Sequence, residues 1–158
     1  MNFNIRDAKT EDMPAVLSLI KELAIFEKEE NAVIVTVNDL ENAGFSAQPL
    51  FKCFIAEIDN EIVGMSLCYP RYSTWKGPTI HLEDLIVTES KRGLKIGGEL
   101  YKKVIEYGYN LGVERVEWAV LDWNEPAIKF YESTGANVLR DWDTAQIDRA
   151  AMKQYLGK

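Results

Sequence analysis

The chain has 158 residues, of which 47% are hydrophobic and 27% charged, so it can bury a core and we expect one compact domain over residues 1–158. Its 18 Lys and Arg residues stand against 25 Asp and Glu residues, which gives a formal net charge of −7. This acidic balance repels nucleic-acid phosphates and anionic lipid surfaces, so we expect neither nucleic-acid nor membrane partners. A small cation has the complementary sign of charge.

The sequence contains one histidine, His81, and two cysteines, Cys53 and Cys68. There is no Cys-x-x-Cys pair and no second histidine to complete a zinc site, so we expect no metal centre. Two cysteines are too few for a disulfide framework, and residues 1–6 show no basic segment followed by an apolar run. These features favour a cytoplasmic protein.

The N-terminal third predicts a strand and two helices. Residues 3–5 alternate as in a strand, and Thr10 precedes an apolar pattern typical of an amphipathic helix that ends at about Phe26. The charged run 27–31 breaks this pattern, and its simplest interpretation is a solvated helix end. A second, shorter helix is predicted from Thr36 to about Gly44.

The middle of the chain changes to the periodicity of strands. Residues 51–58 and 62–69 predict a β-hairpin with a polar turn, and residues 80–87 predict another strand. The break before that strand is expected at Gly77-Pro78, and the aromatic segment 69–75 is expected to be a surface loop or the wall of a pocket.

Helix and strand patterns alternate in the last third. A helix is predicted over residues 94–109, a strand over 113–120 and a helix over about 126–132. Residues 135–156 are expected to form one strand and a short helical tail. The whole order of elements predicts an α/β domain with a mixed sheet.

A glycine-rich turn, residues 88–98, joins the predicted strand 80–87 to the following helix. Such a junction presents unpaired backbone N–H groups and the positive end of a helix dipole, which together bind phosphate. The simpler interpretation is a helix start whose glycines permit tight packing, and glycine content alone favours it. The turn has neither the Gly-Lys-Ser/Thr of a Walker A loop nor the Gly-x-Gly-x-x-Gly of a dinucleotide-binding fold.

The stretch from Arg92 to Gly97 resembles the Arg/Gln-x-x-Gly-x-Gly/Ala acetyl-CoA signature of the GNAT superfamily of N-acetyltransferases. Residues 20–24, 82–85 and 122–136 resemble the spermidine/spermine (diamine) N-acetyltransferases and their thialysine-acetylating relatives. The resemblance implies the GNAT (acyl-CoA N-acyltransferase) fold, an α/β fold whose mixed central β-sheet has helices on both faces and one splayed strand pair. It also implies acetyl-CoA as the cosubstrate.

Contacts to acetyl-CoA are implied at three places. The strand before the turn bonds the pantetheine arm, backbone amides of the turn hold the pyrophosphate, and the next strand-to-helix segment lines the other side of the cofactor. The implied residues are Leu85, Ile86 and Val87 in the strand, Arg92, Gly93, Leu94, Lys95, Ile96, Gly97 and Gly98 in the turn, and Asn124, Ala127 and Tyr131 in the last segment.

Lys95 departs from the signature, which has glycine at this position. With ordinary helical backbone angles, Lys95 still offers its N–H, and its ammonium can approach a cofactor phosphate. If the position needs open space instead, cofactor binding is weakened. We expect the first arrangement because Gly93, Gly97 and Gly98 remain, with Lys91 and Arg92 as further cations for the phosphates.

The resemblance assigns the acid–base chemistry to a carboxylate and a phenol. Glu83 accepts the amine proton through a water, Asp84 holds the substrate cation, and Tyr131 protonates the departing thiolate. Neighbours on a strand point to opposite faces, so Glu83 and Asp84 act at one spot only if the strand is bulged there. Without the resemblance, one of the two carboxylates is a sheet-surface charge and Tyr131 is a core aromatic.

The substrate contacts implied by the resemblance are acidic and aromatic. Glu27 becomes a carboxylate for a cationic amine, and Trp142, flanked by Asp141 and Asp143, supplies a ring face and further acids at the far end of the site. The segment between Gly135 and Trp142 is shorter than in the mammalian polyamine enzymes. A smaller diamine or a thialysine-like amino acid is therefore as good a candidate as a polyamine.

The expected reaction is direct attack of the amine on acetyl-CoA in a ternary complex, which is catalysis by positioning. A covalent cysteine mechanism is less favoured, because Cys53 and Cys68 fall within predicted strands. Two other functions remain open: a non-catalytic acyl-CoA sensor, and a protein or peptide N-acetyltransferase. By analogy with relatives we expect a homodimer.

Overall fold

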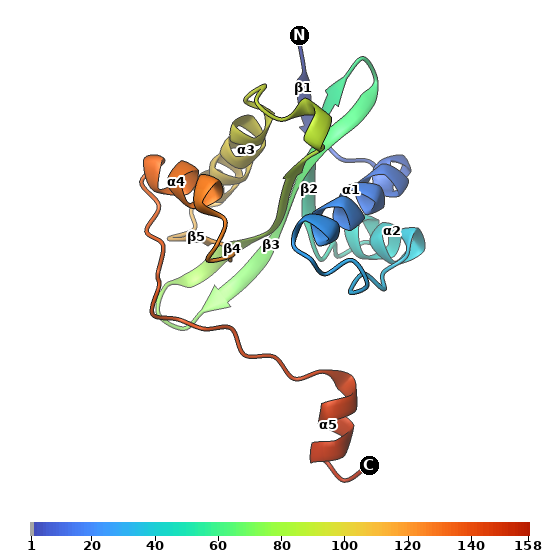
Figure 1. The fold of residues 1–158 in the computed structure, drawn as a ribbon, viewed down its shortest axis with the longest axis vertical. Coiled ribbons are helices and arrows are strands. Elements are labelled where there is room, and N and C mark those ends of the chain that lie inside the picture. Colours follow the sequence, from blue (N-terminus) through green and yellow to red (C-terminus); the bar gives the residue numbers. More distant parts are fainter. Residues whose placement is uncertain (1) are drawn as a thin grey trace. The chain divides into compact units, whose positions relative to one another are not determined.

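The computed structural model describes residues 2–158 and separates into two compact units, one that ends at Ala119 and one that begins at Val120. The first unit contains a five-stranded sheet with strand order β1-β2-β3-β4-β5 (Figure 1). The strands are β1 (Asn4–Asp7), β2 (Lys52–Ile58), β3 (Glu61–Ser73), β4 (Gly77–Val87) and β5 (Val116–Glu117). Neighbours are antiparallel except for β4 and β5, which are parallel, so the predicted mixed sheet is confirmed.

Helices cover both faces of this sheet (Figure 1). A 3-10 turn, η1 (Thr10–Asp12), leads into α1 (Met13–Phe26), which with α2 (Val37–Phe45) lies on one face, while α3 (Ile96–Asn110) lies on the other. Successive side chains of β3 point alternately toward the helices on the two faces of the sheet. Met65 and Leu67 pack in the core beneath α1, whereas the intervening Ser66 donates its hydroxyl to the Leu100 carbonyl of α3 at 3.2 Å.

A hairpin turn and a helix cap fix the ends of two of these elements. Asp59 and Asn60 have φ values of 50° and 66°, the left-handed pair that a two-residue hairpin between β2 and β3 requires. Thr36 caps α2 by accepting the Asp39 N–H at 3.2 Å, and the Asp39 carboxylate accepts the Thr36 N–H in return. Both local signals were readable in the sequence.

Arg6 joins three N-terminal elements through ion pairs. Its guanidinium donates to both carboxylate oxygens of Asp12, at 2.7 and 3.0 Å, and to both of Glu57, at 2.8 and 3.1 Å. These hydrogen bonds hold the pKa of both carboxyls below their usual range. The network therefore ties β1 to η1 and to β2.

The β3–β4 hairpin is longer than the sequence predicts. The expected loop 69–75 and the expected break at Gly77-Pro78 are wrong, because β3 continues to Ser73 and β4 begins at Gly77. Proline is tolerated where a strand has no neighbour on its other side. Pro70 and Pro78 both lie where the hairpin extends past β2 and β5.

The last strand of the sheet is shorter than expected, whereas the helix after it is found close to its predicted bounds. The predicted strand 113–120 is reduced to the two residues of β5, which pair with Ile80 and His81. In the second unit, α4 (Glu125–Ser133) begins after Asn124, which accepts the Ala127 N–H, and α5 (Arg149–Tyr155) begins after Asp148 in the same way.

The strand predicted after Gly135 is wrong, since residues 134–148 form neither helix nor strand. An alternating segment becomes a strand only when a neighbouring strand accepts its backbone hydrogen bonds. The predicted helical tail is confirmed as α5. Within residues 2–158, no helix is both long enough and apolar enough to cross a membrane.

Candidate active site

A β-bulge in β4 determines where the two acidic residues of this strand point. Leu82 pairs with Cys68 and Asp84 pairs with Leu67, so Glu83 is an extra residue with no partner on β3. Leu67 belongs to the core beneath α1, and Asp84 opposite it faces the same side. The condition under which Glu83 and Asp84 can act at one spot is therefore met.

Glu27 comes to the same face from the end of α1. Burial raises the pKa of Glu27, and the charges of Glu29 and Glu83 raise it further. Burial, together with the charges of Glu83 and Glu27, raises the pKa of Asp84 to about 6. The structure thus brings three of the sequence-predicted residues, Glu27, Glu83 and Asp84, into one acidic cluster, an environment that favours a bound cation.

Two further residues, which the sequence did not single out for this site, contact Glu83. The Tyr69 hydroxyl donates to Glu83 Oε2 at 2.8 Å, and burial together with this carboxylate raises the pKa of Tyr69 to about 12. His81 Nε2 lies 3.5 Å from the same oxygen, and the Tyr69 and His81 rings are 5.2 Å apart between centroids. Tyr69 and His81 are cross-strand partners, so only the hairpin register reveals them.

Glu117 of β5 anchors the other side of His81. Its carboxylate lies 3.9 Å from His81 Nδ1, pairs with Arg71, and lies 2.8 Å from Arg115 Nε. Two cations and an imidazole therefore surround this carboxylate, which fixes the hairpin to β5.

The edge of β4 is open where the sequence predicts the pantetheine contact. β5 pairs only with Ile80 and His81, so among the described residues no strand pairs with β4 on that edge from Leu82 to Val87. On the opposite edge, Leu85, Ile86 and Val87 pair with β3. A parallel strand that stops after two residues leaves backbone groups free to bond an extended ligand.

The glycine-rich turn follows β4 through η2 (Glu89–Lys91) and leads into α3 at Ile96. Ile96, Gly97 and Gly98 are the first three residues of α3, whose N–H groups have no acceptor within a helix. The positive end of the helix dipole lies here, which suits a phosphate. The anion site predicted from the sequence thus falls at the start of a helix, and its role stays a prediction.

Lys95 does not have the ordinary helical angles that we expected. Its φ of 66° and ψ of 6° place it in the left-handed region, immediately before α3. The sequence expectation was wrong because the backbone path here is the one that a glycine signature follows, with Gly93 also at a positive φ of 80°. The exposed Lys95 side chain is therefore carried on a conformation unfavourable for a residue with a Cβ.

Arg92 is engaged by protein groups. Its Nε donates to the Val87 carbonyl at 3.1 Å, and its guanidinium carbon lies 5.2 Å from the centroid of the Phe26 ring. The side chain thus connects the turn to the end of β4 and to α1.

The other predicted residues belong to the second unit. Asn124 and Ala127 form the start of α4, and Tyr131 lies one turn beyond Ala127 on the same side of the helix, with 8% of its surface exposed. Trp142 lies in the irregular segment between α4 and α5 and is 71% exposed. The roles predicted for these four residues remain predictions.

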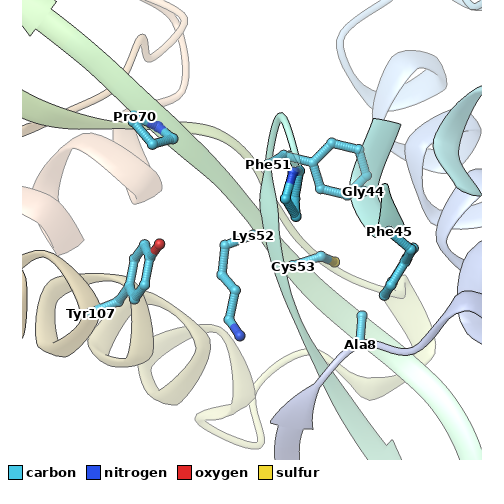
Figure 2. Close-up of a pocket in the computed structure, with 9 residues that line it drawn as sticks. Ala8, Gly44, Phe45, Phe51, Lys52, Cys53, Pro70 and Tyr107 are labelled. Carbon is cyan, nitrogen blue, oxygen red and sulfur yellow. The ribbon is translucent and has the colours of Figure 1, made fainter. Parts of the chain in front are cut away.

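A cavity of about 380 Å³ is lined by none of the predicted site residues. It opens beside the start of β2 and receives side chains from α2, β2 and α3, including Phe45, Cys53 and Tyr107 (Figure 2). Lys52 also reaches it, but its ammonium is paired with Asp7. The acidic cluster and the open edge of β4 therefore remain the candidate site.

The cysteines do not have the environment of a nucleophile. Cys53 and Cys68 are both buried, and burial raises the pKa of each thiol to about 12. A nucleophilic cysteine needs a lowered pKa, so neither thiol suits covalent catalysis. In residues 2–158, no group of three or more His, Cys, Asp or Glu side chains is arranged to hold a metal ion.

Comparison with known proteins identifies the class. The acetyltransferase (GNAT) family profile matches residues 14–136, and the chain belongs to this family. A *Vibrio cholerae* integron cassette protein superposes with a TM-score of 0.79 over 100% of this chain and 99% of the other, at 21% identity. An aminoglycoside acetyltransferase from a soil metagenome superposes with a TM-score of 0.76 over 94% and 100%, at 18% identity. These likenesses confirm the GNAT fold.

Relatives with higher identity define the enzyme type. The thialysine N-epsilon-acetyltransferase of *Bos taurus* is 38% identical over 98% of this chain and 97% of its own length. That of *Caenorhabditis elegans* is 36% identical over the same shares. The human spermidine/spermine N(1)-acetyltransferase-like protein 1 is 37% identical over 85% of this chain, which covers 20% of that protein. The chain is an N-acetyltransferase of the GNAT family.

Proposed function

We propose that this enzyme transfers the acetyl group of acetyl-CoA to a primary amine of a small cationic substrate, by direct attack in a ternary complex. The observation that carries the proposal is the acidic cluster of Glu27, Glu83 and Asp84, which the bulge in β4 gathers on one face. Carboxylates in this arrangement attract an alkylammonium and provide a base for it. The acetylated substrates named for the similar enzymes, thialysine and spermidine or spermine, are amines of this kind.

The open edge of β4 supports the cosubstrate part of the proposal. An extended pantetheine arm has amides that bond to free strand backbone, as an added strand does, so Leu85, Ile86 and Val87 are proposed to bind it. The amides from Arg92 to Gly98 are proposed to hold the pyrophosphate at the start of α3. Asn124, Ala127 and Tyr131, in the second unit, are the further residues proposed to contact the cosubstrate.

The substrate ammonium first loses one proton to Glu83 through a water, and the resulting neutral amine forms a bond to the thioester carbonyl carbon. The carbon–sulfur bond then breaks, and Tyr131 donates its phenolic proton to the thiolate of CoA. The nitrogen loses its second proton, which restores the phenol of Tyr131, and Glu83 releases its proton to solvent. Asp84 and Glu27 hold the remaining positive charge of the substrate, and Trp142 is proposed to close the far end of the amine site.

The preferred amine is proposed to be short. Thialysine N-epsilon-acetyltransferases align over 98% of this chain and 97% of their own length, whereas the spermidine/spermine N(1)-acetyltransferase-like protein aligns over 85% of this chain. A lysine-like amino acid or a small diamine therefore ranks ahead of spermine in the proposal.

The test is release of the CoA thiol from acetyl-CoA with a panel of thialysine, diamines, polyamines and lysine-containing peptides. Turnover with the small amines and none with the peptides is the expected result. Turnover confined to peptides contradicts the substrate class, and binding of acetyl-CoA without turnover on any amine indicates a sensor. The expected single domain and homodimer are checked separately by limited proteolysis and by size in solution, and the cytoplasmic location remains a prediction.

A further inference from the structure

Glu22 of α1 is bonded to the start of the glycine-rich turn. One carboxylate oxygen accepts the Thr88 hydroxyl at 2.9 Å, and the other accepts the backbone N–H of Glu89 at 2.9 Å. Both oxygens are therefore used by two consecutive residues that lie immediately after β4. Hydrogen bonds to a charged acceptor are stronger than those between neutral groups.

A second contact lies one helical turn further along α1. Phe26 is four residues after Glu22 and so occupies the same side of the helix. Its ring receives the Arg92 guanidinium at 5.2 Å, while Arg92 Nε bonds the Val87 carbonyl. The two contacts hold η2 at both of its ends, Thr88–Glu89 and Arg92.

Besides these contacts, the path of the turn is held by the backbone hydrogen bonds of η2 and by the Thr88 N–H, which the Val63 carbonyl accepts at 2.8 Å. None of the three residues of η2 is buried, and the Thr88 side chain does not cap η2. Gly93 and Lys95 both have left-handed backbone angles, and Lys95 is not a residue that prefers them. A segment with exposed residues and an unfavourable backbone conformation depends on outside contacts for its geometry.

Glu22 has the wrong sign of charge for a residue that meets phosphates. A carboxylate close to an anion-binding turn repels the anion through space. Such a residue can favour anion binding only indirectly, when the hydrogen bonds that it accepts orient the turn. Because both of its oxygens are occupied by donors from the turn, orientation is the role that the contacts support.

We propose that Glu22 is a positioning residue for the cosubstrate, one that sets the backbone path of residues 88–95 so that the amides before and within the first turn of α3 converge on the CoA pyrophosphate. The inference rests on the proposed use of acetyl-CoA. Glu22 itself does not contact either substrate in this proposal. It affects the affinity for acetyl-CoA, whereas the acidic cluster is proposed to set the affinity for the amine.

The test uses Glu22→Gln and Thr88→Val in the full chain. Gln retains the size of Glu but turns one acceptor into a donor that faces a donor, and Val removes the Thr88 hydroxyl with little change of shape. Glu114→Gln, at an exposed residue just past the C-terminal end of α3, makes the same charge change at the end of that helix opposite to the turn. Acetyl-CoA affinity is measured by calorimetry, the KM of each substrate by thiol release, and thermal stability by circular dichroism.

Loss of a charge-assisted hydrogen bond is expected to raise the Kd and KM for acetyl-CoA about tenfold in Glu22→Gln. The KM for the amine and the values of Glu114→Gln are expected to stay at the wild-type level. The double variant is expected to lose less than the product of the two single effects, because both remove the same contact.

A lowered melting temperature with an unchanged Kd for acetyl-CoA would mean that Glu22 only stabilises the fold, and would overturn the inference. An equal rise in the KM of both substrates would overturn it as well. If the wild-type protein itself does not bind acetyl-CoA, the proposed function fails at the same time, whereas wild-type binding with an unaffected Glu22→Gln removes the inference alone.

Discussion

Replacing Lys95 by glycine is expected to stabilise the protein. Lys95 has a φ of 66° and an exposed side chain, so the substitution removes a backbone penalty and almost no packing. A left-handed conformation costs a residue with a Cβ about 1–2 kcal/mol, and glycine loses about 0.5–1 kcal/mol more entropy on folding. The midpoints of these two ranges give a net gain in the free energy of unfolding of about 0.75 kcal/mol, or roughly 1.5–3 °C in melting temperature for a chain of this size.

Two control variants isolate the backbone effect. Lys95→Ala keeps the Cβ and removes the ammonium, so it should leave the stability near that of the wild type. Lys91→Gly introduces glycine in η2, where φ is negative, so it should lower the stability. Urea unfolding followed by circular dichroism measures all three variants under the same conditions.

The reasoning is refuted if Lys95→Gly is no more stable than Lys95→Ala. The same variants also separate the two possible effects of Lys95 on acetyl-CoA. If the ammonium attracts a phosphate, both Lys95→Gly and Lys95→Ala bind acetyl-CoA more weakly. If the strained backbone limits binding, only Lys95→Gly binds it more tightly.

Three further predictions concern the acid, the acidic cluster and the N-terminal ion pairs. Tyr131→Phe should lower kcat on the order of 100-fold with nearly unchanged affinity for acetyl-CoA, and unchanged turnover in a thiol-release assay contradicts the assigned role. Asp84 is protonated more readily in the folded protein, with its pKa raised from 3.8 to about 6, so its ionisation costs stability as the pH rises through that window. Asp84→Asn should therefore raise the free energy of unfolding more at pH 8 than at pH 4, while the KM of the wild type for the amine rises as the pH falls below about 6. Arg6→Met should destabilise the protein by about 2 kcal/mol in urea unfolding because it leaves Asp12 and Glu57 unpaired, and a loss below the error of the measurement would show that water replaces the guanidinium.

Helices and caps were largely readable from the sequence, because their signals are local. The apolar spacing gave the end of α1 at Phe26, and Thr36 marked the start of α2. The strand after Gly135 failed for the opposite reason, since a strand depends on a neighbour that may be far along the chain. The same dependence explains why β3 extends past Tyr69 and why β5 is only two residues long.

The candidate site was predicted in its residue types and missed in its geometry. Glu27, Glu83 and Asp84 were identified through the resemblance, but their common face depends on one unpaired residue in β4. Tyr69 and His81 were missed as partners of Glu83 because a cross-strand pair cannot be assigned without the register. Lys95 was expected to be helical because Gly93, Gly97 and Gly98 remain in the turn, but these glycines do not remove the need for a left-handed residue immediately before α3.

The bulge at Glu83 also changes the face of the sheet on which the even-numbered residues of β4 lie. Before it, the even-numbered Leu82 lies opposite Cys68, and after it the even-numbered Asp84 and Ile86 lie on the α1 side. Without Glu83, Leu82 and Asp84 would become adjacent and alternate between faces as in an uninterrupted strand, with every pairing to β3 kept. The pairing of β4 with β3 therefore does not require Glu83, and this one extra residue is what places Glu83 and Asp84 on the same face of the sheet.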